Sequence, residues 1–232
     1  MGEGAEGRDG VRLFRPAVAA FSVAAATLLL QLVQTRIFSV VYWNHTVYFI
    51  VSIALLGFGI SGTWMSFGKD SRLARVLTAP LAAVLFFIST LVSSLAMTQL
   101  DINTAAIATQ KADQYLLYFT YAFAVLPYFF SGWILGLVYR DYAEHMSFLY
   151  FADLVGAAVG CFLFLALIRP LGAVNLVLVA AGLVTFPALA LNPRSRVSVY
   201  GGAICLASFA GILAFEKEID RSIRPEATKA LV

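Results

Sequence analysis

Long stretches without a single charged residue dominate this sequence and restrict the folds open to it. Residues 76–100, 114–139 and 170–193 contain no Asp, Glu, Lys or Arg. Crossing a bilayer takes about 20 mostly apolar residues, because roughly 30 Å of hydrocarbon is spanned at about 1.5 Å per helical residue. A soluble core in a chain of 232 residues would not need so many runs of this length. The pattern predicts a polytopic α-helical membrane protein.

The full set of apolar stretches indicates an all-α fold, a transmembrane helix bundle of about seven spans. A membrane β-barrel is excluded because these runs are uniformly apolar and longer than the roughly ten alternating residues of a barrel strand. The predicted spans are 16–37, 45–67, 76–99, 115–139, 148–168, 171–191 and 197–215. We expect residues 1–15 to be disordered or interfacial, 16–215 to form one membrane domain, and 216–232 to form a polar tail.

The composition agrees with a protein solvated mainly by lipid. The chain is 61% hydrophobic and 12% charged, whereas soluble domains carry about 25% charged residues. A net charge of +3 does not indicate nucleic-acid binding, because the basic residues lie in short loops and not along one face. Cys161 and Cys205 lie in apolar runs, and His45 and His145 are predicted on opposite membrane faces, so we expect no metal site and no cofactor.

The distribution of Lys and Arg predicts a cytoplasmic N-terminus, and we separately expect an integral protein of the bacterial inner membrane. More basic residues fall on one side of the predicted spans than on the other, and the richer side is the cytoplasmic one. The first group is Arg8, Arg12, Arg15, Lys69, Arg72, Arg75, Arg140, Arg194 and Arg196, and the second is Arg36, Lys111 and Arg169. Seven spans would place the tail outside, yet the tail is itself basic, so either it is external or the number of spans differs by one.

Asp153 is the residue most indicative of function, because it lies inside the fifth predicted span. An acidic side chain within a span costs about 3 kcal/mol unless it is paired, hydrated or neutralised. Two interpretations stay open. Asp153 either caps a helix or pairs with Arg140 near the interface, or it contacts a solute or relays protons.

A polar group ends the first predicted span, with Gln31, Gln34, Thr35 and Arg36 within one and a half helical turns. One interpretation is a helix end anchored among lipid headgroups, where a long Arg side chain reaches the interface. The other is a cavity lined by Gln31, with Arg36 as the contact for an anion or a carboxylate.

Three tyrosines, Tyr115, Tyr118 and Tyr121, recur at helical spacing near the start of the fourth predicted span. Interfacial anchoring or packing explains them, and Tyr118 is also a candidate contact for a cationic ligand because ring faces attract ammonium groups. No Ser-His-Asp set, pair of carboxylates within one span or phosphate-binding loop is present, so no catalytic residue is predicted.

Small residues at a spacing of four mark helix faces that approach one another closely. Gly132 and Gly136 form such a pair in the fourth predicted span, and Gly156 and Gly160 form one in the fifth. We expect these two helices to be a tightly packed pair.

Residues 57–62, GFGISG, match the pattern G-x-G-x-x-G of dinucleotide-binding folds. That pattern binds a nucleotide only between a strand and a helix of a soluble βαβ unit. Here it lies inside an apolar helix, so we expect Gly57 to serve close helix packing or a bend.

Three segments together carry a family resemblance. They are LLLQLVQTRIFSVV at 28–41, followed by Trp43 and His45, then SIALLGFGISG at 52–62, and LYFADLVGAAVG at 149–160. This combination resembles the membrane domain of the spermidine-synthase-like integral membrane proteins. In that family a multi-span domain precedes an aminopropyltransferase-like domain. Arg36 and Asp153 fit the family pattern, whereas Gln31 stands where an acid is expected.

The resemblance implies a non-catalytic membrane domain that works with an aminopropyltransferase-type domain or partner. We expect it to anchor that partner, or to pass it a small, cationic, polyamine-like solute through Asp153. The tail at 223–231 resembles the linker that leads to the synthase domain, which is not within these residues. Two alternatives are a structural accessory subunit of a larger membrane complex and an independent small-solute transporter.

Overall fold

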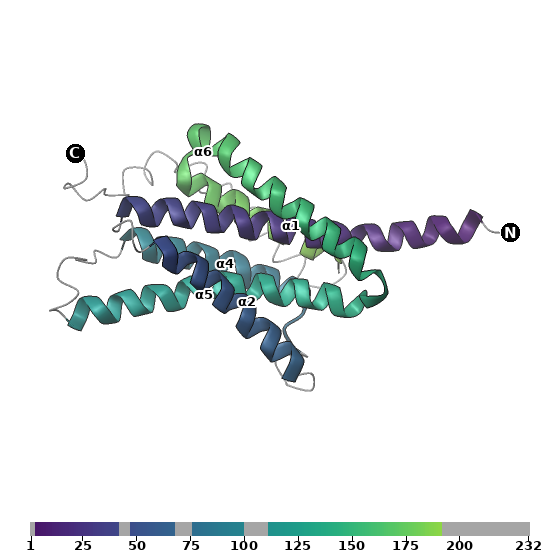
Figure 1. The fold of residues 1–232 in the computed structure, drawn as a ribbon, viewed down its shortest axis with the longest axis horizontal. Coiled ribbons are helices and arrows are strands. Elements are labelled where there is room, and N and C mark those ends of the chain that lie inside the picture. Colours follow the sequence, from purple (N-terminus) through teal and green to yellow (C-terminus); the bar gives the residue numbers. More distant parts are fainter. Residues whose placement is uncertain (1–2, 42–46, 68–75, 100–110, 192–232) are drawn as a thin grey trace.

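The computed structural model describes residues 3–41, 47–67, 76–99 and 111–191, and their regular structure is entirely helical (Figure 1). The all-α prediction is therefore confirmed for this part of the chain. The helices are α1 (Glu3–Val41), α2 (Val47–Phe67), α4 (Ala79–Gln99), α5 (Lys111–Asp141), the short 3₁₀ helix η2 (Ala143–His145) and α6 (Met146–Leu191).

Five helical stretches in the described residues are long and apolar enough to cross a membrane. They are Leu13–Ser39, Tyr48–Phe67, Ala79–Met97, Tyr115–Asp141 and Ala143–Ala173. A sixth, Asn175–Val184, is apolar but shorter. These stretches correspond to the first six predicted spans, and the seventh, 197–215, lies outside the described residues. The structure is thus a helical bundle that is compatible with a membrane, while the total of seven spans stays a prediction.

Gly172 divides α6 into two arms. Its φ of 74° and ψ of 169° are not helical, and glycine adopts a positive φ without the steric penalty that a Cβ atom brings. Figure 1 shows α6 folding back on itself, so the arms before and after Gly172 correspond to the separate spans predicted at 148–168 and 171–191.

Helix α1 is longer than a membrane crossing requires. Its 39 residues extend about 58 Å at the usual helical rise, against roughly 30 Å of hydrocarbon. The N-terminal end of α1 projects beyond the other helices in Figure 1. Residues 3–15, for which disorder was one expectation, are helical, and their interfacial placement stays a prediction.

The bundle contains two closely packed helix pairs, and the partners differ from those predicted. A Cβ atom on Gly156 or Gly160 would collide with the backbone carbonyls of Phe21 and Ala25, so α6 lies directly against α1. The glycines of α5 face α2 instead. The predicted close pair of α5 and α6 is wrong, because a small-residue pattern marks a face for close approach without specifying which helix approaches it.

On α5, a Cβ atom at Gly132 would collide with Ser61 and Phe58, and one at Gly136 would collide with Met65. Helix α4 packs against both α5 and the second arm of α6, whereas α5 and α6 touch sparsely.

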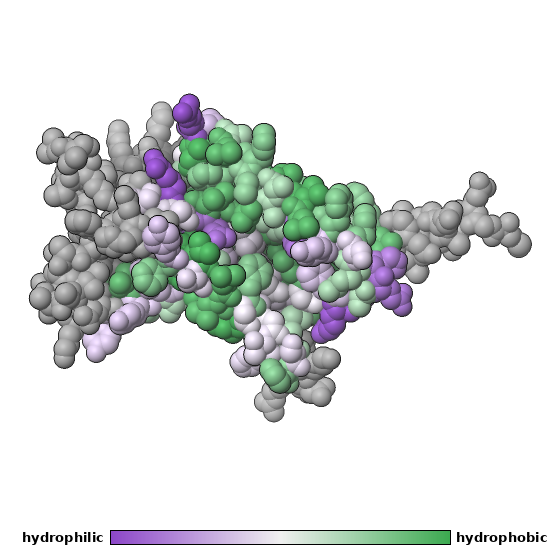
Figure 2. Space-filling model, in the orientation of Figure 1, coloured by the Kyte–Doolittle hydropathy of each residue, from purple (hydrophilic) through white to green (hydrophobic). Residues whose placement is uncertain are grey.

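The outward faces of α2 and of the first arm of α6 are apolar. Leu55, Phe67, Phe162 and Leu165 are each more than two-thirds exposed. Hydrophobic surface predominates between hydrophilic groups that gather toward the two ends of the long axis in Figure 2. An apolar belt of this kind suits contact with lipid tails, because the hydrocarbon core of a bilayer contains no water.

Candidate functional site

Asp153 and Tyr139 form the main candidate site, between the start of α6 and the end of α5. Asp153 is half-buried and lies seven residues after Met146, the first residue of α6, which is about 10 Å along the helix. The Tyr139 side chain of α5 faces the carboxylate. Its hydroxyl is buried and makes no hydrogen bond of ordinary geometry. A carboxylate and a phenol hydroxyl therefore meet within a stretch that is long and apolar enough to cross a membrane.

The carboxylate of Asp153 has no basic partner among the described residues. Arg140 pairs instead with Asp141, at 2.9 Å between Nε and Oδ1, and both of these side chains are about half exposed. Asp153 also lies well inside α6 and not at its first turn, so it does not cap the helix. Neither structural interpretation of Asp153, the cap or the pair with Arg140, is seen in the structure.

The packing of α6 on α1 determines the position of Asp153 along the bundle axis. Gly156 meets Phe21 and Gly160 meets Ala25, so the two helices run parallel and in step. One turn before Gly156, Asp153 is therefore level with the part of α1 near Val18. The carboxylate is held at the end of the bundle to which Arg15 and Arg140 also belong.

The other predicted solute contacts lie far from Asp153. Arg36 is 18 residues beyond the level of Val18 on α1, which corresponds to about 27 Å. Tyr118 is 21 residues from Tyr139 on α5, or about 31 Å. Both side chains are exposed at the opposite end of the bundle. Gln31 is half-buried between the two ends. The four predicted contacts therefore do not form one binding site.

A buried polar cluster centres on Gln34, which the sequence predicts only as part of the polar end of a span. The Tyr128 hydroxyl donates a hydrogen bond of 2.7 Å to Gln34 Oε1. Gln34 Nε2 donates in turn to Ser93 Oγ at 3.3 Å. The three fully buried side chains come from α1, α4 and α5. An amide in an apolar span was the available signal, but its partners are 59 and 94 residues away in sequence.

The glycine pattern at 57–62 lies within the continuous helix α2 and has no strand before it. A Cβ atom on Gly57 would collide with Tyr128 and with the backbone of Phe129 on α5, whereas Gly59 and Gly62 have no atom within 4 Å of such a position. The geometry therefore matches close packing at Gly57 and not a phosphate-binding loop.

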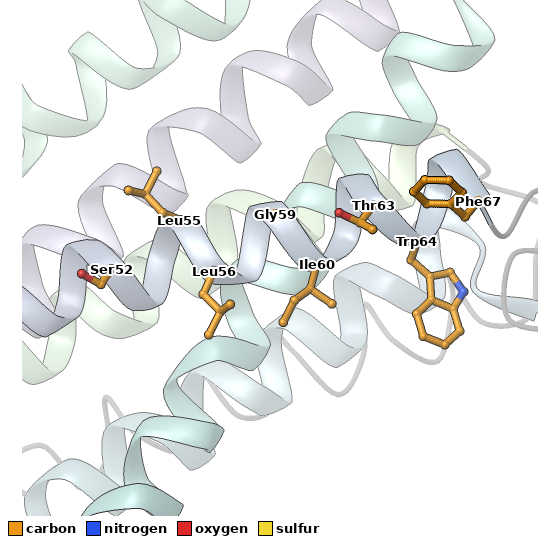
Figure 3. Close-up of a pocket in the computed structure, with 8 residues that line it drawn as sticks. All are labelled: Ser52, Leu55, Leu56, Gly59, Ile60, Thr63, Trp64 and Phe67. Carbon is orange, nitrogen blue, oxygen red and sulfur yellow. The ribbon is translucent and has the colours of Figure 1, made fainter.

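An open groove runs along the outer face of α2 (Figure 3). Its lining residues all belong to this helix, and they are Ser52, Leu55, Leu56, Gly59, Ile60, Thr63, Trp64 and Phe67. A groove with walls from one helix, mostly apolar and facing outward, offers a surface for lipid and does not enclose a polar solute.

No family model, curated protein or solved structure matches this chain. In the part of the chain that the structure describes, no group of three His, Cys, Asp or Glu side chains is placed to hold a metal ion. The chemistry of the candidate site consequently depends on Asp153 and its tyrosine neighbour. A carboxylate attracts a cation, and a phenol hydroxyl can accept from an ammonium N–H or donate to the carboxylate.

Proposed function

We propose that this chain is a non-catalytic, multi-pass membrane domain that presents Asp153 to a small cationic solute. The observation that carries the proposal is a half-buried carboxylate in a helix long and apolar enough to cross a membrane, with no basic side chain within 4.0 Å among the described residues. Acidic groups placed in this way are costly, and they are characteristic of sites that bind ions or pass protons. A solute cation would supply the missing partner.

The surroundings of Asp153 favour an ammonium group over a bare metal ion. The neighbouring donor and acceptor is the phenol hydroxyl of Tyr139, and an ammonium needs few acceptors beyond the carboxylate. A hard metal ion would need six or more oxygen ligands or several retained waters.

The test is solute flux and binding in proteoliposomes, with radiolabelled methylammonium and spermidine as the two probes. Asp153→Asn removes the charge and keeps the shape, so we expect uptake of at least one probe to fall by about tenfold. The matched control is Asp141→Asn, which removes an exposed carboxylate at the same end of the bundle. Equal uptake by Asp153→Asn and the native protein, for both probes, would remove the proposed role of Asp153.

We further propose that the solute is passed to, or the domain anchors, an aminopropyltransferase-type partner. The support is the resemblance carried by residues 28–41, 52–62 and 149–160. Affinity purification from membranes, followed by mass spectrometry and an assay for aminopropyl transfer, tests this point. Recovery of a stoichiometric partner without that activity would favour the second candidate function, a structural accessory subunit. The outward apolar faces of α2 and α6 are compatible with such a subunit.

A further inference from the structure

We propose that Gln34, Tyr128, Ser93 and Thr90 form a second, uncharged site that binds water inside the bundle. This site is separate from the one at Asp153. Tyr128 and Tyr139 are 11 residues apart on α5, which places the two sites about 16 Å apart along that helix.

The hydrogen bonds of the cluster run in one direction through three helices. Tyr128 donates to Gln34, Gln34 donates to Ser93, and the Ser93 hydroxyl donates at 3.1 Å to the backbone carbonyl of Thr90. All four side chains are fully buried. Each bond therefore forms where neither bulk water nor lipid can provide a substitute partner.

The capacity of these groups for hydrogen bonds exceeds what they use with one another. The Thr90 hydroxyl is buried and has no hydrogen-bond partner in the structure. It lies one helical turn from Ser93, on the same face of α4. Gln34 uses one of its two amide hydrogens in this cluster, and the Tyr128 oxygen has acceptor capacity left. The cluster therefore keeps two unused donors and two unused acceptors, a number that suits a buried water molecule, which typically makes about three hydrogen bonds.

The same inventory excludes an ion as the bound species. None of the four side chains carries a charge, and the buried polar residues at helical spacing from them, Ser89 on α4 and Ser131 on α5, are uncharged as well. An ion at this depth would lack a counter-charge and would cost several times more than a neutral polar molecule. Bound water satisfies the unused groups without adding charge.

X-ray radiolytic footprinting of the full chain in nanodiscs tests the proposal, because radicals formed from bound water oxidise the side chains beside it. We expect Tyr128 to be oxidised about threefold faster than Trp133, which is equally buried but bonded to the Leu77 carbonyl at 2.8 Å. Thr90→Val removes the hydroxyl at nearly constant shape and should reduce oxidation of Tyr128. The matched control is Ser89→Ala, because the Ser89 hydroxyl is already bonded to the Phe86 carbonyl.

Oxidation of Tyr128 no faster than that of Trp133 in the native protein would overturn the proposal, and this comparison does not depend on any variant folding. A higher thermal midpoint for Thr90→Val, with oxidation of Tyr128 unchanged, would also overturn it. Loss of an unpaired buried hydroxyl is stabilising when the site is dry.

Discussion

The two polar sites of the bundle differ in charge, burial and partners. Asp153 is ionisable and half-buried, and it faces one hydroxyl, whereas Gln34 is neutral, fully buried and bonded to two helices. A neutral group that forms hydrogen bonds between helices stabilises a membrane bundle. A buried carboxylate without a cation lowers the stability of the bundle, and helix packing does not compensate for this loss. The comparison therefore separates a polar group that holds helices together from one that is available to a cationic ligand.

The packing around Asp153 gives the largest expected effect. Gly156→Leu would force a side chain into the backbone of α1 at Phe21, and we expect the free energy of unfolding to fall by about 3 kcal/mol. The control is Gly62→Leu, since Gly62 has open space beside it. Unfolding in mixed micelles of increasing SDS content measures both variants. Equal losses for the two would show that α6 does not lie against α1 at Gly156.

Removal of the amide at Gln34 comes next. Gln34→Leu leaves Tyr128 and Ser93 without their partner, so we expect a loss of about 1–2 kcal/mol in the same unfolding assay. Gln31→Leu is the control, three residues away on α1 and half-buried. If the Gln31 variant were the less stable of the two, the structural role assigned to Gln34 would be wrong.

Asp153→Asn should change stability with the opposite sign. The substitution removes a charge that has no basic partner among the described residues, so we expect the free energy of unfolding to rise by about 1 kcal/mol while solute uptake falls. A loss of stability together with a loss of uptake would mean that the carboxylate is a structural group, and the contrast with Gln34 would disappear.

Tyr139→Phe gives the smallest effect. The hydroxyl makes no hydrogen bond of ordinary geometry, so stability should change by less than about 0.5 kcal/mol, whereas affinity for the cationic probe should fall by about threefold. Equilibrium binding to purified protein measures the affinity. An unchanged affinity would leave Asp153 as the sole polar contact.

Much of the architecture could be predicted because membrane insertion depends on local composition. The uncharged runs at 76–100 and 114–139 became α4 and α5 nearly as expected. The partner of each helix could not be predicted in the same way. Gly156 predicts close approach of another helix backbone, but only the structure shows that this backbone is the one at Phe21.

The candidate site was predictable in part for a related reason. An acid in an apolar helix is conspicuous in a sequence, so the sequence alone predicts Asp153 as a candidate. Its neighbour Tyr139 belongs to another helix, and a tyrosine near a helix end looks like an interfacial anchor. The sequence predicts Gln34 only as part of a polar helix end, because its bonds to Ser93 and Tyr128 depend on long-range contacts.

The pairing of α1 with α6 has a consequence for biosynthesis. Gly156 leaves the ribosome some 135 residues after Phe21, the residue it lies against, a delay of about 7–27 s at usual elongation rates. Throughout that interval the face of α1 that packs against Gly156 in the folded protein lacks its final partner helix. The insertion machinery, a chaperone or the surrounding lipid must cover this face until the two arms of α6 have been synthesised. Slowed translation would therefore lengthen the time for which the face lacks its final partner.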